Sequence, residues 1–217
     1  MIDQPCYLCA GHGGWHDHEV KESVLCPICR PMESKDHADR LLLPGIVSDW
    51  QHMPAKFHGP KFTIKPHMLI IHSAVIGQNP AKYFLDPIEK TKDGKPYWNK
   101  VSAHLSYCAP IGDYALSVPL NYVAWHAGHT ATWRGQSRIN YYSLSMELPG
   151  PIAAPRTQEQ HDQVRSTVAR LMELVPSLRS VQGHQDIKPT KPDPGPNFDW
   201  SCLEGLGLRC SHFTTVV

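Results

Sequence analysis

Two stretches of the chain carry the residue pattern of β-strands. His67–His72 is an apolar run between two histidines, rich in branched side chains, which predicts a short, fully buried strand. Ser143–Leu148 alternates small polar residues with apolar ones and stops at Pro149-Gly150. This alternation predicts a second strand, and the Pro-Gly pair predicts a turn behind it.

The clearest helical pattern covers Thr157–Val175. Its apolar residues recur at helical spacing: Val164, Val168, Leu171 and Val175. Thr157 and Gln160 have the spacing of a capping box, and Pro176 marks the end of the helix. Lys188–Trp200 is mostly proline, glycine and polar residues, which indicates a loop. Strands followed by a helix and a long loop predict an α/β domain with a mixed sheet.

Length and composition divide the chain into three parts. With 217 residues, 41% of them apolar, it can build one good-sized core and leave roughly 40–60 residues for a small module. We expect a cysteine-bearing module over 1–40, an extended, proline-rich linker over 41–66 and the main domain over 67–217. The net charge of +1 gives no overall field toward nucleic acid or anionic lipid.

Four cysteines near the start form the most specific local pattern. Cys6 and Cys9, then Cys26 and Cys29, are two C-x-x-C pairs, which can close a tetrahedral thiolate shell around zinc. Such a shell leaves no position for water, so this zinc would be structural and the module would resemble a zinc ribbon. The alternatives are unrelated free thiols or a redox pair. The module could dock on nucleic acid or on cell wall, or brace the larger domain.

A second set of metal-binding residue types is spread along the rest of the chain. The whole sequence is rich in histidine, with 14. His72 ends the first predicted strand, His184 follows the helix, and Asp193 lies in the proline-stiffened loop. A catalytic zinc takes three protein ligands and keeps a fourth position for water. A lone histidine at the end of a strand is more often a hydrogen-bonded structural residue, so the pattern indicates only a candidate mononuclear site.

Six motifs between about residues 60 and 200 resemble the zinc-dependent N-acetylmuramoyl-L-alanine amidases. That family is shared by phage lysozyme-type amidases, bacterial wall-recycling amidases and animal peptidoglycan recognition proteins. The motifs occur in this order: Leu69-Ile70-Ile71-His72-Ser73, Val101-Ser102-Ala103-His104, Ala124-Trp125-His126-Ala127-Gly128, Asn140–Glu147, Gly183-His184-Gln185-Asp186-Ile187 and Lys191-x-Asp193-Pro194-Gly195-Pro196. The 1–40 module lies outside the resemblance.

The resemblance implies a central mixed β-sheet flanked by helices, with one zinc in a groove on the sheet. His72, His184 and Asp193 would be the zinc ligands. Glu147 would take a proton from water and pass it to the leaving nitrogen, and Lys191 would stabilise the oxyanion. Trp125 and His126 are expected to line the substrate groove, with packing at the sheet edge as the alternative. Asn140 is expected to bind the stem peptide or, alternatively, to cap a turn.

One position departs from the family pattern. Some members carry a tyrosine directly before the histidine of the second motif, where this chain has Ala103. The loss of that hydroxyl agrees with the branch that relies on a glutamate. His104 itself is expected to be a structural or groove residue and not a ligand.

The resemblance implies a peptidoglycan hydrolase that cuts between N-acetylmuramic acid and L-alanine with one catalytic zinc. The cysteine pairs add the expectation of a second, structural zinc. We expect a phage-type endolysin, because wall-lytic enzymes often carry an added module. The alternatives are a cytosolic amidase that recycles anhydro-muropeptides and a non-catalytic peptidoglycan-binding protein. A nucleic-acid binder is disfavoured, because residues 1–40 mix acidic and basic side chains.

The start of the chain lacks a basic patch followed by an apolar stretch, so no signal peptide is expected. The longest apolar run, Met68–Ile71, is too short to cross a bilayer. We therefore expect a monomer made in the cytoplasm, acting on peptidoglycan or muropeptides without membrane insertion. Of the remaining cysteines, Cys108 is expected in the core, and Cys202 and Cys210 are expected to be reduced.

Overall fold

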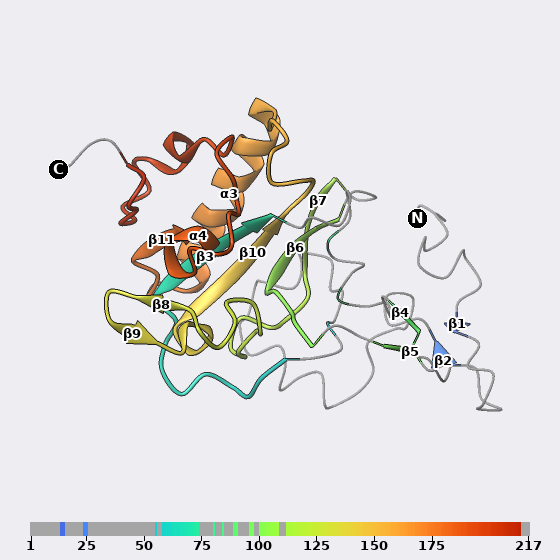
Figure 1. Ribbon diagram of the computed structural model, residues 1–217. Helices are drawn as coiled ribbons and strands as arrows, with labels where there is room; N and C mark the ends of the chain where they lie inside the picture. The colour runs from blue at the N-terminus through green and yellow to red at the C-terminus, as the bar shows by residue number, and fades with distance from the viewer. Residues whose placement is uncertain are drawn as a thin grey trace.

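The computed structural model describes most of the main domain and isolated parts of the preceding chain (Figure 1). The described residues are 14–15, 24–25, 55, 58–73, 80, 84, 89–90, 96–97, 100–108 and 112–213. The predicted zinc ligands Cys6, Cys9, Cys26 and Cys29 lie outside them. Two short antiparallel ladders precede or interrupt the domain: β1 (Gly14–Trp15) with β2 (Val24–Leu25), and β4 (Glu89–Lys90) with β5 (Pro96–Tyr97).

A five-stranded mixed sheet forms the centre of the domain, as the sequence predicts. Its spatial order is β11 (Ser180–Gly183), β3 (Met68–Ser73), β10 (Ser143–Leu148), β6 (Leu105–Cys108) and β7 (Asp113–Leu116). β11, β3, β10 and β6 run parallel to one another, and β7 runs antiparallel to β6. The two strands expected from the residue pattern, β3 and β10, lie side by side near the centre of the sheet.

The alternation of side chains gives the sheet two chemically different faces. On β10, Leu144, Met146 and Leu148 join the main hydrophobic core, whereas Ser143, Ser145 and Glu147 point to the other side. On β3, Leu69 and Ile71 belong to that core, and His72 falls on the polar face. One face is therefore built for packing and the other carries polar groups.

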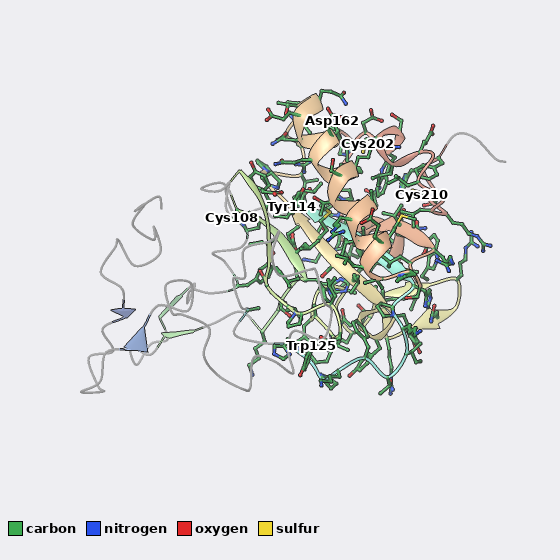
Figure 2. All side chains as sticks on the ribbon, turned by 180° about the vertical axis from the view of Figure 1, so that it is seen from behind. Cys108, Tyr114, Trp125, Asp162, Cys202 and Cys210 are labelled. Carbon is green, nitrogen blue, oxygen red and sulfur yellow. The ribbon has the colours of Figure 1, made fainter. Side chains whose placement is uncertain are left out.

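Helix α3 (Gln158–Leu174) covers the apolar face (Figure 2). Its residues Val164, Val168 and Leu171 are buried in the same core as Leu69 and Ile71. The predicted capping box is present: Gln160 N donates to Thr157 Oγ1, and Thr157 N donates to Gln160 Oε1. The helix ends before Pro176, as predicted.

Short elements complete the domain. Around the polar face they are the hairpin of β8 (Thr132–Trp133) and β9 (Gln136–Ser137), the 3₁₀ turn η3 (Ile139–Tyr141) and the short helix α4 (His184–Ile187). A second 3₁₀ turn, η4 (Trp200–Leu203), packs against α3 in the core on the apolar side. The segment before β3 is extended and pairs with the following loop, since Phe62 N donates to Asn121 O and Val123 N donates to Pro60 O.

Cys202 and Cys210 are half-buried thiols that form no disulfide with each other, and Cys108 is buried, as expected; Figure 2 labels all three. No helix in the described part of the chain is both long and apolar enough to span a bilayer.

Candidate metal centre

The candidate ligands meet at the carboxyl edge of three parallel strands. His72 lies near the end of β3, and His184 opens α4 directly after β11 ends at Gly183. Because β3, β10 and β11 are parallel, their ends reach the same edge of the sheet. This edge is where open α/β sheets generally bind ligands.

His72, His184 and Asp193 are buried and converge on one point. The Nδ1 atoms of His72 and His184 are 3.0 Å apart, and Asp193 Oδ2 lies 3.2 Å from the first and 3.1 Å from the second. The side chains come from positions separated by up to 121 residues in the sequence. Two imidazole nitrogens and one carboxylate oxygen are a donor set typical of a catalytic zinc site.

The hydrogen bonds behind His72 fix which of its ring nitrogens carries the proton. Ser143 Oγ donates to Ile139 O at 2.8 Å, so it accepts from His126 Nε2 at 3.1 Å. His126 Nδ1 then accepts from His72 Nε2 at 3.0 Å. The Nδ1 of His72 is therefore left with a lone pair that faces His184 and Asp193.

His184 also carries its ring proton on Nε2. Its Nε2 donates to Ala127 O at 3.4 Å, which leaves its Nδ1 unprotonated as well. Burial lowers the pKa of His72 to about 4, so its ring is neutral near pH 7, as a metal ligand requires. Two lone pairs and a carboxylate oxygen share a centre with no proton between them, and a divalent cation fits that arrangement.

Glu147 lies beside this centre. It pairs in register with His72 on β3 and with Ser106 on β6, and its side chain is on the same polar face. Burial and, to a smaller degree, the charge of Asp193 raise the pKa of Glu147 to about 8. A carboxyl with a pKa near neutrality can both accept and return a proton.

The loop that carries Asp193 is held by a brace that the sequence analysis missed. Arg156 Nη2 donates to Ser73 Oγ at 2.6 Å, and Ser73 Oγ donates to Pro194 O at 2.9 Å. Arg156 Nη1 also donates to Pro149 O at 2.6 Å, which ties the loop to the end of β10. Arg156 stands directly before the helix cap and carries no motif of its own.

Gly195 explains why the Asp-Pro-Gly sequence suits this loop. Its φ is 97°, a conformation that L side chains rarely adopt. A Cβ placed there would also collide with the backbone carbonyl of Ile152. Glycine therefore lets the loop turn back tightly and bring Asp193 to the two histidines.

Trp125 and Asn140 line a hollow of about 740 Å³ beside the segment that contacts His184. The same hollow is bordered by Tyr141, whose ring meets Trp125 edge-on at 5.9 Å, and by the exposed cations Lys100 and Arg138. This combination of aromatic rings and positive charges can receive a sugar and an acidic peptide.

His126 and Asn140 are already engaged within the protein. Both ring nitrogens of His126 have partners, and Asn140 Oδ1 accepts from His126 N at 3.2 Å and from Ala127 N at 2.8 Å. Lys191 has an exposed side chain on the loop that leads to Asp193. The structure thus brings the three predicted ligands and Glu147 together and gives His126 and Asn140 internal contacts.

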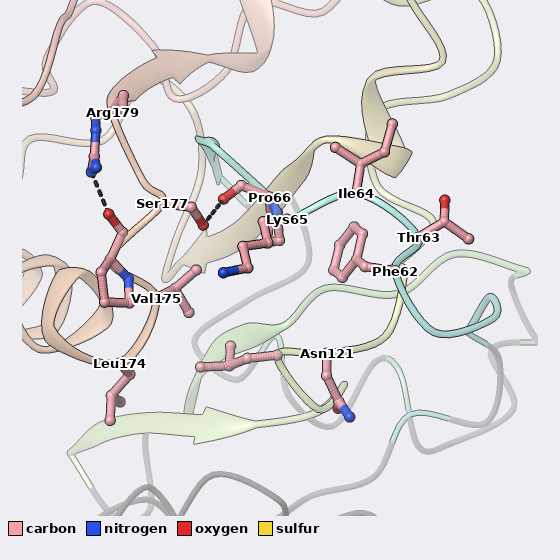
Figure 3. Close-up of a pocket in the computed structure, with 12 residues that line it drawn as sticks. Phe62, Thr63, Ile64, Lys65, Pro66, Asn121, Leu174, Val175, Ser177 and Arg179 are labelled. Atoms are coloured by element: carbon pink, nitrogen blue, oxygen red, sulfur yellow. Dashed lines mark hydrogen bonds between the residues drawn. The ribbon is translucent and has the colours of Figure 1, made fainter.

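A further hollow of about 630 Å³ lies between the segment before β3 and the end of α3 (Figure 3). Its walls include Phe62, Ile64, Leu174 and Val175, and Ser177 Oγ donates to Pro66 O at 2.6 Å beside it. None of the predicted site residues lines this hollow.

Comparison with known proteins gives one consistent family. A family model described as N-acetylmuramoyl-L-alanine amidase matches residues 63–196. The chain is 31% identical to 1,6-anhydro-N-acetylmuramyl-L-alanine amidase AmpD of Enterobacter cloacae, over 76% of this chain and 94% of the relative. It is 33% identical over 42% of its length to N-acetylmuramoyl-L-alanine amidase AmiD of Escherichia coli, and the match covers 37% of that protein.

Solved structures agree with this likeness. A crystal structure of an AmpD selenomethionine derivative superposes with a TM-score of 0.62 at 26% identity, covering 74% of this chain and 95% of the other. AmiD of E. coli in complex with anhydro-N-acetylmuramic acid-L-Ala-D-γ-Glu-L-Lys superposes with a TM-score of 0.53 at 26% identity, covering 67% of this chain and 58% of the other.

Proposed function

This chain belongs to the N-acetylmuramoyl-L-alanine amidase family, and from that premise we propose that its substrates are soluble anhydro-muropeptides. The bond cut is the amide between the muramic acid and L-alanine. The observation that carries the anhydro preference is the similarity to AmpD over nearly the whole length of that relative. The AmiD complex with an anhydro-muropeptide supports the same class of ligand.

In this proposal His72, His184 and Asp193 hold the catalytic zinc. A zinc ion bound there supplies a Lewis acid that activates water and polarises the amide carbonyl. The chain of hydrogen bonds from His72 through His126 to Ser143 keeps the His72 ring oriented toward the metal. His126 is thus given a positioning role in place of the substrate contact expected from the sequence.

Glu147 is proposed to move the proton. It stands beside His72 on the neighbouring strand, so its carboxyl can take a proton from attacking water and pass it to the alanine nitrogen as that nitrogen leaves. Lys191, two positions before Asp193, is proposed to place its ammonium near the oxyanion of the tetrahedral intermediate. Both steps use side chains on the polar face or its bordering loop.

The hollow beside Trp125 is proposed to hold the rest of the substrate. The Trp125 indole offers an apolar surface for the sugar ring, and Lys100 and Arg138 can pair with carboxylates of the stem peptide. Asn140 contributes by fixing the Trp125-His126-Ala127 segment through its two accepted hydrogen bonds.

The relatives favour the recycling alternative over the endolysin that the added N-terminal module suggested. Of that module the structure describes only β1 and β2, and its four cysteines lie outside the described residues, so it adds no structural support to the endolysin hypothesis. A binding protein without activity is also disfavoured, because all three ligand positions carry metal-binding side chains that meet at one point.

The test compares two substrates with zinc-loaded protein. We expect release of free L-alanine N-termini from a 1,6-anhydro-muropeptide at a kcat/KM at least about tenfold above that for solubilised wall fragments with reducing-end muramic acid. Glu147→Gln should lower kcat on either substrate by about 10²–10⁴-fold while zinc content stays the same. Equal or faster cleavage of the wall fragments would favour the endolysin, and full activity of Glu147→Gln would remove its assigned role.

A further inference from the structure

A small basic hollow lies at the opposite edge of the sheet from the candidate metal centre. It has a volume of about 280 Å³ and is bordered by His67 and Met68, where β3 begins, and by Ser180, where β11 begins. The metal ligands follow the carboxyl ends of the same strands. We call this hollow the basic pocket; its charged walls are Arg134, Arg179 and Arg209.

The positive charge of the basic pocket is not balanced by the residues around it. Three arginines line the pocket and no aspartate or glutamate does. Arg179 also borders the hollow of Figure 3, where its guanidinium donates to the backbone carbonyl of Pro176. It donates to the carbonyl of Leu178 as well, and neither carbonyl carries a net charge. Within the part of the chain that the structure describes, Arg134 and Arg209 make no ion pair with a carboxylate. The net charge of the chain is only +1, so this excess is local.

Arg134 occupies a backbone conformation that arginine disfavours. It stands at the tip of the β8–β9 hairpin with φ at 47°, followed by Gly135 with φ at 80°. Two-residue turns of this kind favour asparagine, aspartate or glycine at the first position. A non-glycine residue in this region costs about 1 kcal/mol or more, and such cost is commonly kept at functional sites.

The same hairpin supplies an aromatic wall. The Arg134 guanidinium lies 5.4 Å from the centre of the Trp133 ring, which itself packs against the core of the polar face. This contact restricts the side chain of Arg134 at the mouth of the pocket. The exposed arginine is therefore partly ordered before any ligand arrives.

We propose that the basic pocket binds a multivalent phosphate anion of about the size of pyrophosphate. Guanidinium groups pair with phosphate oxygens through two parallel hydrogen bonds, and three of them match more than one negative charge. The volume is at the lower end for ligand sites, which suits a small anion better than a sugar-peptide. The inference does not depend on the proposed amidase substrate.

The test is calorimetric titration of the zinc-loaded protein with inorganic pyrophosphate at constant ionic strength, with inorganic phosphate as a second probe. We expect one site, with pyrophosphate the tighter ligand. Arg134→Ala and Arg209→Ala should each weaken binding by about tenfold or more, because each removes charge-assisted hydrogen bonds. Arg209→Lys should be intermediate, since it keeps the charge and loses the planar fork.

Lys61→Ala is the matched control, because it removes one exposed positive charge outside the pocket. It should leave pyrophosphate affinity unchanged, and Lys61→Ala and the arginine variants should keep wild-type amide hydrolysis and melting temperature. Three results would overturn the proposal: no measurable binding, equal weakening by Lys61→Ala, or binding that survives both arginine changes but is lost in His184→Ala. The last result would locate the anion at the zinc.

Discussion

At His72 the position of one ring proton decides whether the side chain can bind a metal. The proton sits on Nε2 because His126 accepts it, and His126 is held in turn by Ser143. We expect Ser143→Ala to raise the zinc dissociation constant by about tenfold, since partners behind a metal ligand typically contribute that much. Competition with a zinc-binding dye measures the constant. Ser137→Ala, an exposed position on β9, is the control. Equal zinc affinities in the wild type, Ser143→Ala and Ser137→Ala would contradict the role of the hydrogen-bond chain from His72 through His126 to Ser143.

Arg156 acts at the same scale on the third ligand. It holds Ser73, which holds the carbonyl of Pro194 next to Asp193. Arg156→Ala should lower the free energy of unfolding by about 1–3 kcal/mol, because buried acceptors lose a charged donor. Urea denaturation of the zinc-loaded protein measures this loss. The exposed pair of Arg170 with Glu173 provides the comparison, and Arg170→Ala should cost less than about 1 kcal/mol.

Helix α3 depends on its first turn as well as on its buried face. The hydroxyl of Thr157 accepts from Gln160 N, and the Gln160 side chain accepts from Thr157 N. Thr157→Ala should cost about 1 kcal/mol and lower the melting temperature by roughly 2–4 °C. Thr157→Ser keeps the acceptor and should remain close to wild type. A melting temperature for Thr157→Ala equal to that of the serine variant would show that the cap contributes nothing.

His104 ties two strands and a loop together, as expected for a structural residue. Its Nδ1 accepts from Ser145 N at 3.0 Å, and its Nε2 donates to Tyr122 O at 2.9 Å. Burial lowers the pKa of His104 to about 4, well below its ordinary value of 6.5. The ring is therefore neutral in the folded protein, where the titratable side chains of His58 and His126 lie close to it.

Lowering the pH should destabilise the folded protein through His104. Between pH 6.5 and 4 the unfolded chain binds a proton at His104 that the folded chain does not, so stability falls as pH falls. From pH 7 to pH 5 this single group should cost about 2 kcal/mol. Urea denaturation at both pH values, compared with His104→Gln, isolates the effect. The prediction fails if the two proteins lose the same stability over this range.

Local patterns were sufficient for the elements whose residues specify them locally. The apolar run of β3, the alternation of β10 and the capped helix α3 all depend on neighbours in sequence, and all are confirmed. The hairpin β8–β9 has two residues in each strand, too few to show a period. The pairing of β11 with β3 joins residues more than 100 positions apart, which no periodicity reports.

The candidate site was likewise predicted only in part from the sequence. Composition and spacing alone indicated a candidate metal site at His72, His184 and Asp193, and the family resemblance selected these residues as ligands. The relay through His126 and Ser143 and the Arg156–Ser73 brace were not predicted, because serine and arginine at these positions have no motif. Their roles follow from contacts between distant segments.

For the whole chain the number of bound metal ions remains a prediction. We expect two zinc ions per chain, one at His184 and its partners and one at the four cysteines. Elemental analysis should find one ion fewer in His184→Ala and one fewer in Cys26→Ser, with hydrolysis lost only in the first. Chelation followed by zinc should restore activity to the wild type. One ion in the wild type and none in His184→Ala would leave the cysteine pairs without a metal.

The division of β3 and β10 into an apolar and a polar face has a consequence for how such a domain can change over generations. Odd and even positions of one strand answer to different selective pressures, since neighbouring side chains point to opposite layers. Mutations at Leu69 or Leu144 change the free energy of unfolding, whereas mutations at His72 or Glu147 change the candidate catalytic site. A lineage could therefore gain thermal stability through substitutions on the apolar face while the catalytic residues on the polar face stay the same.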